Sequence, residues 1–244
     1  SANLKTWAKV DGCPGRLLRA LLPLRCLLFG SRGAGRDRCD GCARDIPRND
    51  VCCPRCAVPL KAPAPLCGEC IEREPPFASA WVPFQYAHPL DLLEARFKFR
   101  GDLAAGRVLA ELMIERTGID APVRPDLVIA VPLHVARLRE RGYNQAFELA
   151  KPLARALGVP IDRDLLARTR ATPAQSGLDA ATRRRNVRHA FAVRTVAPLP
   201  GHVALFDDVM TTGATLRECA RVLQRAGIAR VDVWALARAP QRAR

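Results

Sequence analysis

The sequence predicts an α/β protein with a mostly parallel sheet flanked by helices, preceded by a small cysteine-rich module. Over residues 77–244, short apolar runs of strand length alternate with segments of helical periodicity, which is typical of βαβ units. Nine of the ten cysteines lie within residues 13–70, and residues 26–76 form a loop-rich stretch without a sustained hydrophobic period. Leucines at helical spacing come before it. We therefore expect a helical lead-in at 1–25, a metal module at 26–76 and the α/β domain at 77–244.

Two pairs of cysteines indicate what holds the metal module together. Cys53 and Cys56 form one CxxC pair, and Cys67 and Cys70 form a second pair ten residues later. Each pair can place two thiolates on one tetrahedral ion, so the four complete a closed zinc site without a position for a reactive water. The alternatives are disulfides or free thiols, but an isolated cluster in an otherwise cysteine-poor chain favours metal. The predicted zinc is structural.

Hydrophobic patterns predict the elements of the α/β region. Period-two or short continuous apolar runs indicate strands, and apolar residues three and four apart indicate helices, two of which end at a glycine. The predicted strands are 81–86, 127–131, 203–206 and 231–236, and the predicted helices are 89–99, 103–116, 145–157 and 215–226.

The charge of the chain points to an anionic partner. The net charge is +15, from 39 basic and 24 acidic residues, which favours phosphates, nucleotides or nucleic acid. The alternative is a solvated basic surface without a particular partner. No apolar run approaches the roughly 18 residues of a membrane span. The most apolar early stretch, 17–29, is interrupted by Arg19, Pro23 and Arg25 and lacks a cleavage site. We expect a cytoplasmic protein with no membrane span.

The segment 203–215, with the sequence VALFDDVMTTGAT, carries the strongest functional signal. An apolar strand presents Asp207 and Asp208 at its carboxyl end, where open α/β sheets bind ligands. These acids suit the hydroxyl groups of a ribose and could position a magnesium ion. The alternative is that they only end a strand and cap a helix.

The loop after the two acids is typical of a phosphate site. Its amides and the N-terminus of the next helix can hold an anion, its threonines add hydroxyl donors, and its glycine permits close approach of the backbone. The predicted binding residues of the loop are Thr211, Thr212, Gly213, Ala214 and Thr215.

These thirteen positions resemble the phosphoribosyl pyrophosphate (PRPP) signature of type I phosphoribosyltransferases. Further blocks are similar to the ComF/GntX family, whose members combine an N-terminal zinc ribbon with a phosphoribosyltransferase-type domain. The blocks are VPLH at 131–134, RERGYNQ at 139–145, Thr172 with QSGL at 175–178, and RRRN at 183–186 followed by Ala190 and Phe191. The resemblance covers about residues 26–238. It implies a type I phosphoribosyltransferase-like sheet that binds PRPP with magnesium.

The resemblance also implies roles for arginines. The loop after the strand at 127–131 would be the pyrophosphate loop, with Arg139 and Arg141 as charged contacts, because guanidinium groups clamp phosphate oxygens bidentately. The alternative is that both only solvate the start of a helix. Residues 168–188 would form a catalytic hood, or else an exposed basic loop or a nucleic-acid contact. The arginines of this segment are Arg168, Arg170, Arg183, Arg184 and Arg185.

Other polar and cysteine residues have structural interpretations. Tyr143, Asn144 and Gln145 either orient the pyrophosphate loop internally or touch a ligand. His134 is interpreted as a surface or capping residue, and Cys219 as part of the core.

Family members often carry a second zinc ribbon upstream, and here it is incomplete. The pair at 39–42 is intact, but the expected first pair has Cys26 followed by Phe29, which cannot bind a metal. Either this ribbon has lost its ion, or Cys13 or Cys52 supplies the missing ligand. We expect a metal-free remnant.

Three functions are compatible with these observations. As an enzyme, the protein would transfer phosphoribose to an unidentified nucleobase or amine, stabilising the charge that leaves with pyrophosphate. The resemblance also implies a non-catalytic role in DNA uptake during natural competence, with single-stranded DNA and a helicase-like partner. Because aromatic residues make up only 5%, such binding would rest on backbone phosphates and depend strongly on salt. The third function is a PRPP-sensing regulator.

Overall fold

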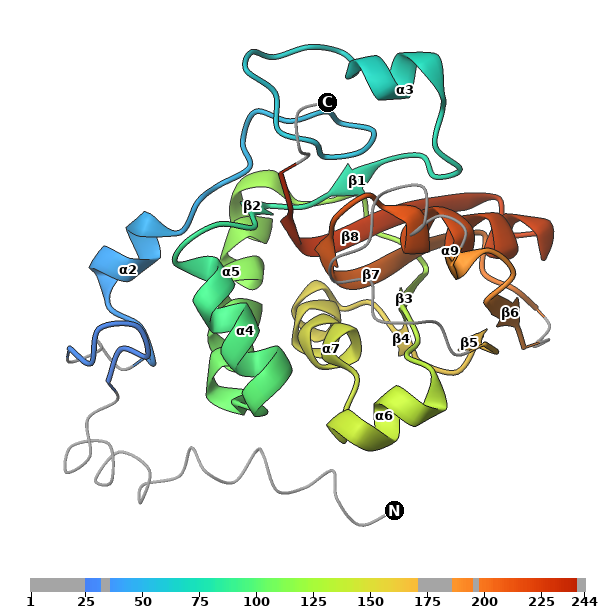
Figure 1. Cartoon of the computed structure of the whole chain (residues 1–244). Helices are drawn as coiled ribbons and strands as arrows, with labels where there is room; N and C mark the ends of the chain where they lie inside the picture. The colour runs from blue at the N-terminus through green and yellow to red at the C-terminus, as the bar shows by residue number, and fades with distance from the viewer. Residues whose placement is uncertain (1–24, 32–35, 171–185, 195–197, 241–244) are drawn as a thin grey trace. The chain divides into compact units, whose positions relative to one another are not determined.

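The computed structural model describes residues 25–31, 36–170, 186–194 and 198–240 (Figure 1). The chain divides into two compact units, Ser1–Ile46 and Pro47–Arg244. The four cysteines from Cys53 to Cys70 therefore belong to the same unit as the sheet. Apart from its last residue, the predicted lead-in at 1–25 lies outside the described residues, as does most of the predicted hood at 168–188.

The second unit is built on a parallel sheet, as the sequence predicts. Among the described residues its strand order is β1-β8-β7-β3-β4, with β2 also paired to β8, and every pairing is parallel. The strands are β1 (Ala80–Trp81), β2 (Phe84–Gln85), β3 (Leu127–Ala130), β4 (Ile161–Asp162), β7 (His202–Met210) and β8 (Arg230–Arg238).

Pro83 explains why the predicted strand at 81–86 is divided in two. Trp81 lies opposite Trp234 and Phe84 opposite Ala237, so both pieces keep one register on β8. Proline has no amide hydrogen to donate to the ladder, and the pairing is interrupted there.

Helices cover both faces of the sheet (Figure 1). On one side lies α9 (Ala214–Arg225); on the other lie α4 (Leu90–Arg100), α5 (Leu103–Asp120) and α7 (Gln145–Leu157). Asp102 begins α5 by accepting hydrogen bonds from the amides of Ala104 and Ala105, and Gly158 ends α7 in the left-handed conformation, as the sequence predicts. The short helix α6 (Val135–Arg141) was not predicted.

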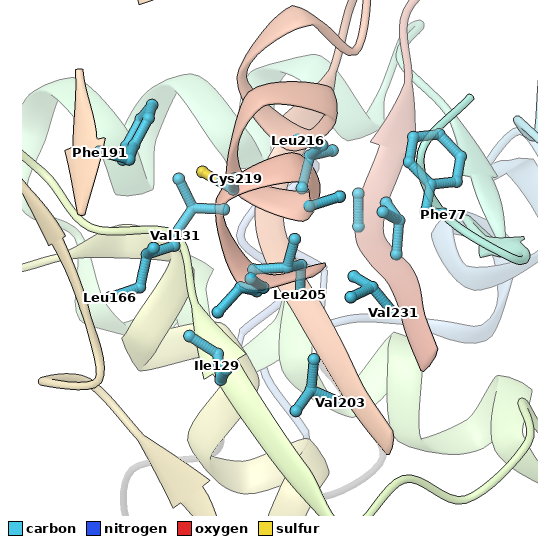
Figure 2. Packing of buried hydrophobic residues seen from close by; sticks show 14 of the residues in the cluster. Phe77, Ile129, Val131, Leu166, Phe191, Val203, Leu205, Leu216, Cys219 and Val231 are labelled. Atoms are coloured by element: carbon cyan, nitrogen blue, oxygen red, sulfur yellow. The ribbon is translucent and has the colours of Figure 1, made fainter. Parts of the chain in front are cut away.

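The core under α9 is formed by alternate residues of the central strands. Because side chains alternate along a strand, Val203 and Leu205 of β7 face the same side as Val231 of β8. There they pack with Leu216 and Cys219 of α9 (Figure 2). Cys219 is fully buried, in agreement with its interpretation as a core residue.

The remaining elements of the described residues are short. An antiparallel pair, β5 (Leu166–Arg168) with β6 (Phe191–Val193), lies apart from the main sheet. The helix α3 (Gly68–Glu72) lies in the second unit and α2 (Asp40–Asp45) in the first. No helix in the described part of the chain is both long and apolar enough to cross a membrane.

Candidate functional site

The sheet topology creates a cavity between β3 and β7. From β3 the chain continues through α6 and α7 to β4, whereas from β7 it continues through α9 to β8 on the opposite side. Ligands bind at such switch points, beyond the carboxyl ends of the strands. β7 pairs with β3 only as far as Phe206 but continues along β8 to Met210. A cavity of about 790 Å³ lies here, lined by both acids and by the loops that follow the two strands.

The two acids are presented to opposite sides of the strand. Alternation places Asp208 on the side of α4, where Lys98 Nζ lies 2.7 Å from its carboxylate. Lys98 also lies 3.0 Å from Glu94, a buried acid. Asp207 faces the side of α9, and no ion pair to it is found among the described residues. Both acids still line the cavity, because it extends around the end of the strand.

These surroundings separate the pKa values of the two acids. Burial raises the pKa of Asp207 to about 8, and the negative charge of Asp208 adds to the effect. Burial acts on Asp208 in the same direction, but the charge and hydrogen bond of Lys98 outweigh it and lower the pKa of Asp208. Of the two acids, Asp207 is therefore the one that keeps its proton to the higher pH.

The loop after β7 leads through Gly213 into the N-terminus of α9, whose first-turn amides can hold an anion. Gly213 has φ +69, in the left-handed region, and a Cβ there would lie 2.8 Å from Met210 Cε. Gly213 is also the N-cap of α9, so the cap residue offers no side-chain oxygen to compete with a ligand for the first-turn amides. Of the five predicted loop residues, four line the cavity, namely Thr211, Gly213, Ala214 and Thr215.

Thr212 is the predicted loop residue that does not line the cavity. Its hydroxyl instead accepts a hydrogen bond from the amide of Ala214 at 3.4 Å. The structure therefore gives Thr212 a role within the turn.

Helix α6 brings one of the two predicted arginines to the cavity. Arg141 lines it, whereas Arg139 is exposed and does not. Arg137, which was not predicted from the sequence, lines the cavity together with Arg141. Positions 137 and 141 are four residues apart and share a helix face, and 139 lies on a different face. Recognising α6 as a helix would have indicated this pair.

Residues next to α6 position its loop. Asn144 donates to the carbonyl of Val131 at 3.0 Å, accepts from the amide of Ala146 and thereby begins α7. Tyr143 donates to the carbonyl of Phe97. His134 caps α6 through Nδ1 and the amide of Ala136, as its interpretation from the sequence proposed. Asn144 and Tyr143 thus make internal contacts of the kind that orient this loop.

Two arginines from the start of the predicted hood lie within the described residues. Arg168 lines the cavity, with its guanidinium 5.4 Å from the centre of the Phe191 ring. Arg170 donates to the carbonyls of Asn186 and Arg188. The segment 171–185, which includes Arg183, Arg184 and Arg185, lies outside the described residues.

The four predicted zinc ligands converge. The sulfurs of Cys53, Cys56, Cys67 and Cys70 all lie within 4.8 Å of one another, and those of Cys56 and Cys67 are 3.5 Å apart. A tetrahedral ion with Zn–S bonds of about 2.3 Å places its sulfurs about 3.8 Å apart, so the cluster fits zinc. Every cysteine of the described residues is a free thiol, which argues against disulfides.

The first unit holds an incomplete cluster. The sulfurs of Cys26, Cys39 and Cys42 also lie within 4.8 Å of one another. Phe29, at the expected fourth position, is 71% exposed. Of the two proposed substitutes, Cys13 lies outside the described residues and Cys52 packs against the main core.

Fold and site together define a class of protein. It is an α/β protein that presents an acid pair and an anion-type loop at the switch point of a parallel sheet and that carries zinc-ribbon CxxC pairs. A family model described as a double zinc ribbon domain matches residues 17–71.

Comparison with known proteins identifies the family. The chain is 38% identical over 206 residues to the DNA utilization protein YhgH of Salmonella typhi, covering 82% of this chain and 89% of that protein. It is 36% identical over 208 residues to competence protein F of Haemophilus influenzae, covering 82% and 90%. The chain belongs to the family of these DNA utilization and competence proteins, and the resemblance to ComF/GntX proteins is confirmed.

A solved structure similar to this one is the glutamine PRPP amidotransferase of B. subtilis in complex with ADP and GMP. The TM-score is 0.37 and the identity 21%, and the match covers 54% of this chain and 26% of that chain.

Proposed function

We propose that this chain binds PRPP with magnesium in the cavity between β3 and β7. One observation carries the proposal: Asp207, Asp208 and the loop with Gly213 line the same cavity at a switch point of the sheet. In this arrangement, the loop amides and the N-terminus of α9 hold the 5′-phosphate, and the acids accept hydrogen bonds from the ribose hydroxyls. The ion pair of Asp208 with Lys98 supports the acceptor role, because it keeps that carboxylate ionised.

In the proposed reaction, phosphoribose passes from PRPP to an acceptor that the sequence and the fold do not identify. The bond between C1 of the ribose and the pyrophosphate oxygen breaks, its electron pair leaves with the pyrophosphate, and a nucleophile bonds to C1. Arg137, Arg141 and Arg168 all line the cavity, and we assign them to bind the departing phosphates. Magnesium, held by the acids and the phosphates of the ligand, would supply further neutralisation of negative charge.

Calorimetric titration with PRPP and magnesium tests the binding, and pyrophosphate release with a panel of nucleobases and amines tests turnover. Asp208→Asn should abolish both, since the amide removes the charge and an acceptor. Asp164→Asn is the matched control, because Asp164 is an exposed acid outside the cavity wall. The absence of any signal for the wild-type protein at millimolar PRPP would reject the proposal.

A second candidate function is the handling of single-stranded DNA, alongside a helicase-like partner. The names of the relatives, DNA utilization protein and competence protein, support it, as does the net charge of +15. With little aromatic surface, affinity would rest on phosphates and fall steeply with salt. Salt-sensitive binding of an oligonucleotide that survives Asp208→Asn would support this function. PRPP binding with neither turnover nor DNA affinity would instead support a sensor.

A further inference from the structure

Arg238, the last residue of β8, connects the four-cysteine cluster with the loop of the candidate site. Its side chain is 1% exposed. On one side, Nε donates to the carbonyl of Cys56 at 3.2 Å. On the other side, Nη1 donates to the carbonyl of Met210 at 2.8 Å and to that of Thr211. One buried guanidinium therefore holds a zinc-ligand residue and the start of the anion loop.

The charge of this guanidinium requires a counter-charge nearby. A buried cation is costly unless it is paired, and the hydrogen-bond acceptors found for Arg238 among the described residues are all main-chain carbonyls. Four thiolates around Zn²⁺ carry a formal charge of about −2. With Cys56 in direct contact, the loaded cluster supplies the negative charge that Arg238 lacks in its other contacts.

The hydrogen bonds on the loop side fix the direction of the amides. In a trans peptide the carbonyl and the N–H point in opposite directions. Because Arg238 binds the carbonyls of Met210 and Thr211, the amides of Thr211 and Thr212, which belong to the same peptide units, are directed away from the guanidinium. Arg238 thus sets which groups the loop can offer to an anion.

A second contact joins the same two regions. Arg217, in the first turn of α9, donates to Glu69 of α3 at 3.2 Å, and its guanidinium lies 5.9 Å from the centre of the Phe77 ring. Glu69 lies between the zinc-ligand residues Cys67 and Cys70. The cysteine cluster is therefore attached both to the end of β7, where the loop begins, and to the first turn of α9, where it ends.

We infer that Arg238 is a positioning residue that couples metal in the four-cysteine cluster to ligand binding at the loop. This inference rests on the proposed binding of PRPP at that loop. A loaded cluster holds Arg238, and Arg238 holds the loop in its anion-binding geometry. Since coupling between two sites is reciprocal, bound PRPP must in turn raise the affinity of the cluster for zinc, and we expect this as slower zinc loss.

The experiment measures the rate at which the full-length protein loses zinc to a zinc-selective indicator, without ligand and with saturating PRPP and magnesium. Without ligand, Arg238→Met should lose zinc about tenfold faster than wild type, because outer partners of metal ligands contribute that much to affinity. Arg230→Met is the matched control. Arg230 lies at the other end of β8 and pairs with Asp232, which His202 also contacts at 2.8 Å. The buried acid therefore keeps a partner in this variant, and zinc should be lost at the wild-type rate.

The measurement with PRPP and magnesium distinguishes coupling from a purely structural role of Arg238. PRPP should slow zinc loss from wild type about fivefold or more, which is a typical allosteric factor. Arg238→Lys keeps the charge but not the fork that reaches both carbonyls, so PRPP at saturation should no longer slow its zinc loss. If Arg238→Met does not fold, Arg238→Lys is used both without and with PRPP. Without PRPP it should still lose zinc faster than wild type.

Two results would overturn the inference. One is wild-type zinc retention in the Arg238 variants, and the other is PRPP that binds wild type without slowing zinc loss. Failure of the proposed function is distinct, because wild type would then bind no PRPP at all.

Discussion

Asp207 and Asp208 are neighbours in the chain with opposite surroundings. Lys98 keeps Asp208 ionised, whereas Asp207 is half-buried and has no ion pair among the described residues. Two adjacent acids would repel each other if both were ionised, and this arrangement avoids that repulsion. A ligand that brings its own cation would remove the repulsion and favour ionisation of Asp207.

The raised pKa of Asp207 predicts a pH-dependent stability. From the unfolded value of 3.8 up to about 8, the folded protein retains a proton that the unfolded chain has released. The free energy of unfolding contributed by Asp207 therefore falls as pH rises through that window. In Asp207→Asn this contribution disappears, so the difference in stability between variant and wild type should increase from about pH 5 to about pH 8. Urea unfolding at several pH values measures it, and a constant difference would contradict the assignment.

Lys98 joins two acids, which predicts a large effect of its removal. In Lys98→Met, the carboxylate of Glu94 loses its cation at a side chain that is 2% exposed. Removing one partner of such a pair costs about 3 kcal/mol. The double variant Glu94→Gln with Lys98→Met should recover most of this, since a neutral side chain remains at 94. Lys151→Met on α7, an exposed position, should change stability by less than about 0.5 kcal/mol. Equal effects at 98 and 151 would reject the buried pair.

At the scale of elements, the loop after β7 depends on a single backbone conformation. Any residue with a Cβ at Gly213 must adopt the left-handed conformation and displace the side chain of Met210. The need for a residue without a Cβ is confined to position 213. Its effect on ligand binding can therefore be measured separately from its effect on the stability of α9.

Gly213→Ala should lose about 1–2 kcal/mol of stability through its backbone conformation and should also bind PRPP more weakly. The control is Gly227→Ala, just beyond the other end of α9. Gly227 also has a positive φ, +105, but a Cβ there would meet nothing within 4 Å. The control should be destabilised while keeping its affinity for PRPP. Thermal melting and calorimetric titration of both variants test this, and equal affinities would show that the loop geometry is not required.

Elements with long apolar periods could be predicted from the sequence, and short ones could not. The helices α7 and α9 were predicted within a residue of their bounds because their apolar faces and terminal glycines are distinct. The strand β7 continues four residues beyond its predicted end, since Asp207 and Asp208 interrupt the apolar run while the ladder with β8 holds the backbone. The pair β5 and β6 is too short for a period to be visible.

The same reasoning applies to the candidate site. The meeting of the two acids with the loop could be predicted, because ligand sites of α/β sheets lie at the carboxyl ends of the strands. The four-cysteine cluster could be predicted separately, because paired CxxC spacings are typical of zinc sites. Arg137 was missed because its role depends on the face of a seven-residue helix. Arg238 was missed because its importance comes from contacts with residues 56 and 210, which are far from it in the chain.

At the scale of the whole molecule, the two cysteine clusters belong to different compact units, so their metal content can be tested separately. The cluster of the second unit has four thiols and forms a closed site. The cluster of the first unit has three among the described residues, and an exposed Phe29 stands at the position of the fourth. A structural zinc site requires four ligands, so we expect one zinc per chain.

Metal analysis of the purified protein should give a zinc-to-protein ratio near one. Cys70→Ser should lose this zinc and melt at a lower temperature, because the cluster lies in the same unit as the sheet. Cys42→Ser, which changes a buried thiol of the other cluster, should keep the ratio unchanged. A ratio near two that falls to one in Cys42→Ser would show that the first unit completes its site with a further ligand, such as Cys13. A ratio near zero in the native protein would reject the zinc ribbon itself.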